Sequence, residues 1–375
     1  MANVSSSNGL EKRPKLRFPG FDEPYKQCRI GDIYAERSQR GASDMELLSV
    51  TMNDGVMPRS EIEGKDNSSE DKSNYKVVLT GDMVYNSMRM WQGANGISPC
   101  DGIVSPAYTV LMPKIPISNG YFAAFFKSPN LINEFRKNSQ GMTSDTWNLK
   151  YPQIETIKVC IPALSEQNRV ADMLRTLERR IAKQAQLVDN LKKYKRGLIK
   201  LVFEKVMSEA HYQLPLSDLC ISISSGRTTV NESNGRYPLF GSTGIVGMTN
   251  TIEHDGDIVM VARVGANAGK VNFFSGRCGV TDNTLVIRVK ENTIHPKFLA
   301  YFLENFDLHK LIFGSGQPLV TGGQLKKIQS PVIAYKAQLL ITRSLESLDR
   351  IIGTQDTYME KLIQLKSGLM QRLFI

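Results

Sequence analysis

Two stretches of the chain, at 166–205 and 337–375, carry the same long helical pattern, offset by 171 positions. In both, apolar residues recur at alternating spacings of four and three, as in a helix that packs lengthwise against another helix. The first seam contains Val170, Leu174, Leu177, Ile181, Val188, Leu191, Leu198 and Val202, and the second contains Ile341, Leu345, Leu348, Ile352, Met359, Leu362, Leu369 and Leu373. The chain is therefore predicted to be an internal duplication built around two long helices.

Both seams are interrupted at equivalent positions, by Gln184 and Lys195 in the first and by Gln355 and Lys366 in the second. A helix of about 38 residues is roughly 57 Å long. We expect the helices to pair antiparallel about a pseudo-two-fold axis as a rod of fixed length, with the glutamines fixing its register and the lysines reaching outward to solvent. The alternative is that each helix packs only on its own globular domain.

The repeat predicts four segments, which are globular parts at 1–160 and 207–330 and helices at 161–206 and 331–375. Residues 1–14 are expected to form a flexible polar lead-in, and the polar stretch 53–74 a surface loop. The globular parts are themselves related. GDMVYNSM at 81 aligns with GDIVMVAR at 256, QGANGIS at 92 with VGANAGKV at 264, and YFAAFF at 121 with KFLAYF at 297. The predicted fold class is α+β, with two mostly-β domains separated by a pair of long helices.

The formal net charge of +10 favours a polyanionic partner such as nucleic acid, although a merely basic protein is the alternative. Neither a signal-peptide core nor an apolar run of membrane-spanning length is present, so we expect a cytoplasmic protein without membrane contact. The five cysteines are scattered and never form a C-x-x-C pair, which indicates reduced thiols, and the histidines lack zinc-ligand spacing.

Several motifs approach those of enzymes without matching them. GANAGKV at 265–271 resembles a phosphate loop, but its glycines are too close and Val271 replaces the Ser or Thr that would bind Mg²⁺. No dinucleotide-binding fingerprint, nucleophile elbow or Pro-Pro pair of a base methyltransferase occurs. Asp54 with Glu63 and Lys65 is nuclease-like, but it lies in the polar loop without strand context. We therefore expect no catalytic activity.

Five segments together resemble the DNA specificity subunit of type I restriction–modification systems. These are PKLRFPGF at 14–21, the stretch 81–111, YPLFGSTGIVG at 237–247 with GDIVMVARVGANAGKV, IPALSEQ at the start of the first helix, and the helix ends GLIKLVF and GLMQRLF. The resemblance covers essentially the whole chain. One departure is SPVIAYKAQ, in which Pro331 and Gln338 are two residues further apart than Pro162 and Gln167.

This resemblance implies a non-catalytic subunit that binds double-stranded DNA. Two modification (methyltransferase) subunits would dock on the helices, and restriction (motor-nuclease) subunits would join the full complex. S-adenosylmethionine, ATP and Mg²⁺ would be bound by those partners, so no cofactor is expected in this chain. Each globular domain would read one half of a split target, and the helices would set the gap. Because the loops of the two domains differ, we expect the halves to be unlike.

Base edges in the major groove are read by Arg, Lys, Asn and Gln on exposed loops. The first domain offers Arg89, Gln92 and Asn95 beside Trp91, the second offers Arg263, Asn267 and Lys270, and later polar loops offer Gln140 and Gln317. The alternative is that these segments are structural turns with the arginines ion-paired at the surface. Lys192, Lys193 and Arg196 on the first helix could contact phosphate, although a solvated helix face is the simpler interpretation.

Two other functional classes compete with DNA recognition. The chain could be a protein-interaction scaffold whose positive charge only aids solubility, or a self-sufficient enzyme, which the missing catalytic motifs disfavour. Sequence-selective, salt-sensitive DNA binding would separate the first from a DNA-reading subunit, and a methylation assay of the chain alone would test the second.

Overall fold

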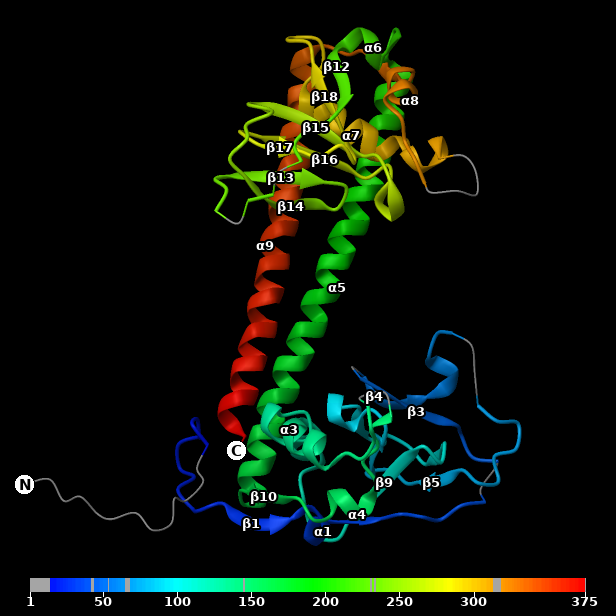
Figure 1. Ribbon diagram of the computed structural model, residues 1–375, viewed down its shortest axis with the longest axis vertical. Coiled ribbons are helices and arrows are strands. Elements are labelled where there is room, and N and C mark those ends of the chain that lie inside the picture. Colours follow the sequence, from blue (N-terminus) through cyan, green and yellow to red (C-terminus); the bar gives the residue numbers. More distant parts are fainter. Residues whose placement is uncertain are drawn as a thin grey trace, which may run out of the picture. The chain divides into compact units, whose positions relative to one another are not determined.

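The computed structural model describes residues 14–41, 44–52, 54–64, 68–143, 146–229, 231–232, 234–312 and 318–374. The chain divides into two compact units (Figure 1). Unit 1 comprises Met1–Gln184 and Tyr358–Ile375, and unit 2 comprises Ala185–Thr357. Each unit thus holds one globular part and a portion of both long helices. The segment boundaries predicted at 160, 206 and 330 stay predictions.

Unit 1 is built on a four-stranded sheet with the order β2-β9-β6-β7, in which the hydrogen-bonded strands run antiparallel. Three two-stranded ladders, β1-β10, β3-β4 and β5-β8, complete it. Its strands are β1 (Lys26–Arg29), β2 (Tyr34–Glu36), β3 (Leu48–Thr51), β4 (Gly55–Pro58), β5 (Lys76–Val78), β6 (Met83–Asn86), β7 (Asn95–Ile97), β8 (Gly102–Val104), β9 (Tyr108–Pro113) and β10 (Lys158–Ile161). Its short helices are α1 (Ile30–Ile33), η1 (Arg59–Glu61), η2 (Met90–Gln92), α2 (Asn119–Phe125), α3 (Pro129–Asn138) and α4 (Tyr151–Ile154).

Unit 2 repeats the four-stranded sheet, in the order β12-β18-β15-β16, and the terminal ladder, β11-β19. Its remaining strands form a three-stranded sheet of order β14-β13-β17, whereas those of unit 1 form the ladders β3-β4 and β5-β8. Its strands are β11 (Gln213–Pro215), β12 (Cys220–Ser225), β13 (Tyr237–Gly241), β14 (Gly244–Thr249), β15 (Asp257–Ala262), β16 (Val271–Ser275), β17 (Gly279–Val280), β18 (Thr284–Val289) and β19 (Gln329–Pro331). Its short helices are α6 (Leu216–Leu219), η4 (Gly265–Asn267), α7 (Pro296–Phe306), η5 (Leu308–Leu311) and α8 (Gly322–Lys326).

The strand registers fix how the two sheets correspond. In unit 1 Met83 pairs with Leu111, and in unit 2 Val259 pairs with Ile287, so both partners shift by 176. This register aligns Gly93 with Gly269, which have φ of 88° and 87°. The predicted alignment of the two Gly-Ala-Asn segments, at a shift of 172, is therefore wrong. In unit 1 that segment ends η2 and begins β7, whereas in unit 2 it forms η4 itself.

The long helices are α5 (Leu164–Glu209) and α9 (Tyr335–Leu373). In unit 1 Lys366 pairs with Glu178 (2.7 Å), and Arg180 hydrogen-bonds the Tyr358 hydroxyl. In unit 2 Lys192 pairs with Asp356 (3.0 Å), and Lys195 pairs with Asp349 (2.8 Å). Within each unit the partner's number falls as the α5 number rises, so the helices run antiparallel there, as predicted.

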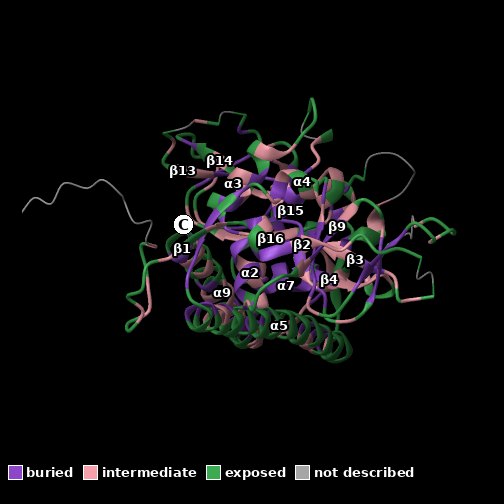
Figure 2. Ribbon diagram, turned by 90° about the horizontal axis from the view of Figure 1, so that it is seen from below, coloured by how far each residue is buried: buried purple, intermediate pink, exposed green. Residues whose placement is uncertain are grey.

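The predicted seam is the buried side of both helices, because every seam residue is buried or half-buried. The outer side of α5 is exposed along much of its length (Figure 2). Of the polar interruptions, Gln184 is buried and Gln355 half-buried, and their role in register stays a prediction. Lys195 does not reach outward as expected. Its ammonium lies between Asp349 and Glu304 and 5.2 Å from the centre of the Tyr301 ring.

Helix α5 also packs on the globular part of each unit, so the alternative, in which each helix packs only on its own globular domain, is wrong. In unit 2, Ile199 and Phe203 of α5 belong to the core formed with Phe298 and Phe302 of α7. In unit 1, Val170 and Leu174 of α5 join the core around α2. Full burial of a side chain as large as Phe203 stabilises the folded state by about 1.5–3 kcal/mol. Helix α5 therefore packs both against α9 and against the globular parts.

Candidate nucleic-acid interface

The turn between β6 and β7 holds the first predicted set of DNA-reading residues. It contains η2, which ends at Gly93 in the left-handed conformation that glycine tolerates best. A Cβ at Gly93 would also lie 3.2 Å from Ile132 of α3, so the turn is seated closely on that helix. Arg89 is exposed and Gln92 half-buried, with Arg89 Nη1 3.5 Å from Gln92 Oε1. Arg89 has no ion pair with any described residue, contrary to the structural alternative.

Asn95 does not fit its predicted role as a base reader. Its side chain is 0% exposed, and its Nδ2 donates to the Gly93 carbonyl at 3.1 Å. Asn95 lies in β7 opposite Tyr85 of β6, which places it inside the sheet layer and away from the surface. The polar amide holds the backbone at the end of the turn. We therefore remove Asn95 from the set of candidate DNA contacts.

Gln140 lies in a second loop that approaches this turn. Gln140 and Asn148 exchange two backbone hydrogen bonds of 2.9 and 2.8 Å, which close the 140–148 loop. The Gln140 side chain is exposed. Immediately after the loop, the Leu149 N–H donates to the Ser87 carbonyl at 2.8 Å, and the rings of Trp91 and Trp147 meet edge to face. The structure thus brings Arg89, Gln92 and Gln140 to one surface of unit 1.

Unit 2 joins the equivalent two segments in the same way. The Val320 N–H donates to the Arg263 carbonyl at 2.8 Å, and the Gly265 N–H donates to the Pro318 carbonyl at 3.1 Å. Asn267 is half-buried on η4, and Lys270 is exposed beyond it. Arg263 is half-buried, and its Nε has no hydrogen-bond partner among the described residues. Gln317 lies outside the described residues.

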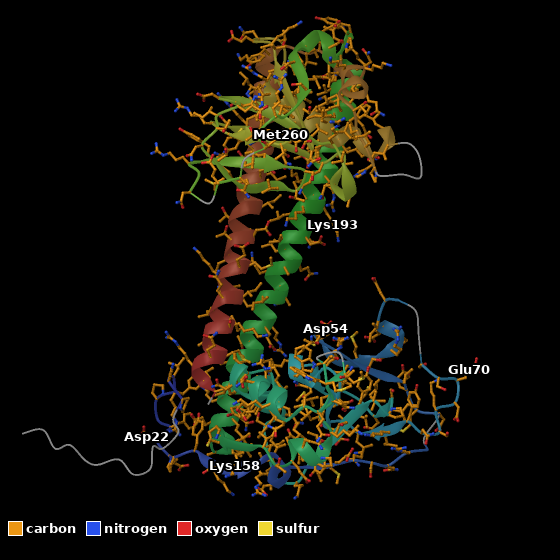
Figure 3. The ribbon with its side chains drawn as sticks, in the orientation of Figure 1. Asp22, Asp54, Glu70, Lys158, Lys193 and Met260 are labelled. Carbon is orange, nitrogen blue, oxygen red and sulfur yellow. The ribbon has the colours of Figure 1, made fainter. Side chains whose placement is uncertain are left out.

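A groove of unit 1 is lined by both acidic and basic side chains, unlike these turns. It has a volume of about 740 Å³ and lies between the globular part and the helices. Asp54 at the β3–β4 turn (Figure 3) and Glu178 line it together with Lys127, Arg175 and Lys366. Burial, followed by the nearby charge of Lys366, lowers the pKa of Lys127. Because acidic and basic groups alternate here, the groove offers less to an anionic backbone than the turns do.

The helix cations are largely engaged within their own unit. Lys192 pairs with Asp356, and Lys193, which projects from α5 in Figure 3, pairs with Asp189 at 2.6 Å. Both ion pairs are exposed, and such pairs contribute little stability. The predicted phosphate role of these lysines and Arg196 stays a prediction, and the solvated helix face remains the simpler interpretation.

Sequence reasoning missed a buried glutamine at the start of each long helix. Gln167, 3% exposed, accepts from the Ser118 N–H at 3.0 Å and donates to the Pro162 carbonyl at 3.0 Å. Gln338, 1% exposed, accepts from the His295 N–H at 2.7 Å and donates to the Ile333 carbonyl at 3.0 Å. Ser118 and His295 are the N-caps of α2 and α7. The shared spacing of 171 between the two glutamines was the available signal.

Sequence reasoning also missed a set of hydrogen bonds in unit 1, which we call the Arg17–Glu166 clasp. Arg17 binds Glu166 with two hydrogen bonds of 2.9 and 2.8 Å, and the Tyr25 hydroxyl donates to the same carboxylate at 3.2 Å. The Leu16 N–H donates to the carbonyl of Arg372 near the end of α9 at 3.0 Å. The chain's N-terminal segment thus ties the start of α5 to the end of α9. In unit 2, Ala337 occupies the position of Glu166 in the repeat.

The outward faces of the helices carry exposed apolar side chains. On α5, Leu187, Tyr194 and Leu201 follow one another at intervals of seven and are 44%, 62% and 66% exposed. On α9, Leu365 occupies the position equivalent to Tyr194 in the repeat and is also exposed. Residues seven apart share one side of a helix. We call the three α5 residues Leu187, Tyr194 and Leu201 the outer stripe.

The described residues hold neither a membrane-spanning helix nor a cluster of metal ligands. No helix among them is long and apolar enough to cross a membrane. Within the same residues, no group of three or more His, Cys, Asp or Glu side chains is placed to hold a metal ion.

Comparison with known proteins gives consistent matches. The family described as the type I restriction modification DNA specificity domain matches residues 23–193 and 213–362. The EcoprrI type I restriction enzyme specificity subunit of Escherichia coli is 28% identical over 123 residues, which cover 33% of this chain and 30% of that protein. The MjaVIII type I restriction enzyme specificity subunit of Methanocaldococcus jannaschii is 24% identical and covers 80% of this chain and 81% of that protein.

Solved structures share the fold. The crystal structure of the type I restriction–modification S subunit from M. genitalium superposes with a TM-score of 0.64 at 14% identity, over 97% of this chain and 99% of that one. A structure from work on complex assembly and conformational transition of the type I system gives a TM-score of 0.60 at 15% identity, over 96% and 99%. These likenesses concern the fold. Since the family match spans both halves and most of the sequence, the chain belongs to the type I restriction–modification DNA specificity family.

Proposed function

We propose that the chain is the cytoplasmic, non-catalytic DNA-recognition subunit of a type I restriction–modification complex, in which each unit reads one half of a split target. One observation carries this proposal. Both units join the same two turns by the same backbone hydrogen bond, Leu149 to Ser87 in unit 1 and Val320 to Arg263 in unit 2. The side chains around that junction differ. A repeated scaffold with unlike side chains suits two readers of unlike half-sites.

The exposed and half-buried side chains at each junction have the chemistry of base recognition. Arg89 and Gln140 in unit 1, and Asn267 and Lys270 in unit 2, offer the guanidinium, amide and ammonium groups that hydrogen-bond base edges in the major groove. The formal net charge of +10 would add a sequence-independent attraction to phosphate. The half-sites would differ, because Gly265 and Ala268 stand in unit 2 where the strand register places Arg89 and Gln92 in unit 1.

The outer stripe supports a docking role for the long helices. Exposed apolar residues at heptad spacing mark the face on which another helix packs. Leu365 of unit 1 is equivalent in the repeat to Tyr194 of unit 2, so each unit carries an exposed apolar residue at this helix position. We propose that two modification subunits bind there, and that restriction subunits join in the full complex. S-adenosylmethionine, ATP and Mg²⁺ would be held by those partners.

Selection of bound sequences from random duplex DNA tests the proposal. The chain, purified with its modification subunit, would be used at several salt concentrations. We expect enrichment of one sequence with two specified segments, and an affinity that falls steeply with salt. A ten-fold preference over unrelated DNA corresponds to about 1.4 kcal/mol, and specific readers exceed this widely. Binding without enrichment, or binding insensitive to salt, would favour the protein-interaction scaffold.

A further inference from the structure

The chain has two tryptophans, and both lie at the unit 1 junction. Trp91 and Trp147 are separated by 56 positions in the sequence. Their ring centres nevertheless lie 5.2 Å apart at an interplanar angle of 78°, an edge-to-face contact. This geometry is the favoured one for aromatic pairs, because the positive ring edge meets the negative ring face. The pair joins the turn at 88–93 to the loop at 140–148.

Trp91 is held firmly on its side of the contact. It lies in the middle of η2, and its Nε1 donates to the Met88 carbonyl at 3.0 Å. The turn behind it is fixed by Gly93, which is packed against Ile132 of α3. The indole of Trp91 therefore has a defined position relative to the exposed Arg89. The indole of Trp91 can therefore serve as the rigid partner in its contact with Trp147.

Trp147 belongs to a loop whose two ends are joined by backbone hydrogen bonds. The Gln140–Asn148 hydrogen bonds close the loop, and Leu149 after it is fully buried. The described tip residues 141–143 are exposed, and Met142 is 100% exposed. No hydrogen bond joins these tip residues to the 88–93 turn in the part of the chain that the structure describes. The indole contact is thus the side-chain link between the loop and the turn.

We propose that Trp91 and Trp147 form a positioning pair that makes the 88–93 turn and the described loop residues 140–143 and 146–148 one reading surface for the half-site of unit 1. The inference rests on the proposed function. In unit 2 the equivalent positions are Asn267 and Pro318, and the two segments are joined by the backbone hydrogen bond from Gly265 to Pro318. Beyond the backbone hydrogen bond that both units share, the two segments are therefore joined by an aromatic contact in unit 1 and by a second backbone hydrogen bond in unit 2.

Two substitutions at Trp147 test this dependence. Trp147→Leu removes the edge-to-face contact and leaves the backbone bridge of the loop intact, whereas Trp147→Phe keeps an aromatic ring. Both would be measured in the complex with the modification subunit. The DNAs are the selected target and two versions in which one half-site is scrambled. We expect Trp147→Leu to lower discrimination at the unit 1 half-site by about ten-fold, with discrimination at the other half-site unchanged and Trp147→Phe within about three-fold of wild type.

The wild-type complex supplies a second measurement that needs no variant, provided that tryptophans contributed by the modification subunit are replaced. Emission then reports on this junction alone. Target DNA, and DNA retaining only the unit 1 half-site, should shift the emission, while DNA retaining only the unit 2 half-site should not. No shift with the full target would overturn the inference, even if Trp147→Leu fails to fold.

The remaining outcomes separate this inference from the proposed function. Unchanged discrimination in Trp147→Leu, or an equal loss at both half-sites, would overturn the positioning pair while leaving bipartite recognition intact. If the wild-type complex selects no sequence at all, the proposed function itself fails. A loss at the unit 1 half-site that Trp147→Phe restores would support the pair if Trp147→Leu unfolds at the wild-type denaturant midpoint by circular dichroism, because a role limited to stability would require unit 1 to be destabilised.

Discussion

Units 1 and 2 share the strand order of their four-stranded sheets, the hydrogen bond at the turn junction and a buried glutamine at the start of the long helix. They differ in the side-chain contacts that hold their helices and loops in place. Unit 1 uses the Arg17–Glu166 clasp and the tryptophan pair. Unit 2 has neither, but Lys195 sits among Asp349, Glu304 and Tyr301. The duplication has kept the backbone framework, while the side chains that anchor and present the loops have diverged. Substitutions that disturb the shared backbone framework should therefore have similar effects in both units. Substitutions in the side-chain contacts that differ should affect only the unit that holds them.

The largest asymmetric effect is expected from Arg17→Ala. Glu166 is 1% exposed, and removal of its cation leaves a buried carboxylate that, among the described residues, keeps only the side-chain hydrogen bond from Tyr25. Breaking such a pair should cost unit 1 about 3 kcal/mol of unfolding free energy. Denaturation followed by tryptophan fluorescence reports on unit 1, because it holds both tryptophans. Arg175→Ala, which removes an exposed pair with Asp172, is the matched control and should have little effect. A small loss in Arg17→Ala would show that the clasp is not structural.

Symmetric effects are expected from Gln167→Ala and Gln338→Ala. Each substitution removes the partner of an N–H and of a carbonyl, which are buried at Gln167 and half-buried at Gln338, and this costs about 1–3 kcal/mol. Hydrogen exchange should quicken in α2 for the first variant and in α7 for the second, each with its own unit. Gln186→Ala, at an exposed position of α5, should change neither. If one glutamine proved dispensable, the two helix starts would not be equivalent.

A smaller difference is expected on acidification, because all four histidines lie in unit 2. Burial lowers the pKa of His254 and of His295 below the usual 6.5. Between that value and the lowered pKa, the unfolded chain binds more protons than the folded one, so unit 2 loses stability as pH falls below about 7. Circular dichroism, which follows both units, should reveal earlier unfolding at pH 5.5 than tryptophan fluorescence does. The double variant His254→Asn, His295→Asn should reduce this gap, and an unchanged gap would assign it to other groups.

The paired helices were predictable from sequence because a heptad seam is local and repeats. Their second buried face was not, since Ile199 and Phe203 are buried by α7, almost a hundred residues away in the chain. The Arg17–Glu166 pair joins residues 149 apart and leaves no periodic signal. At the candidate site, a three-residue strand such as β7 is too short for alternation to show which face Asn95 occupies. The prediction that the turns are exposed succeeded for Arg89 and Gln140, which lie outside the strands.

The most direct measurement is the methylated motif in cells that express the chain with its modification subunit, for wild type and for a chain lengthened by one heptad in both α5 and α9. Seven helical residues add about 10.5 Å, which equals roughly three base pairs. We predict two unlike specified segments at a constant gap, and the same segments with a gap about three base pairs longer in the lengthened chain. A palindromic or contiguous motif would contradict the two unlike readers, and an unchanged gap would contradict the role of the helices in spacing them.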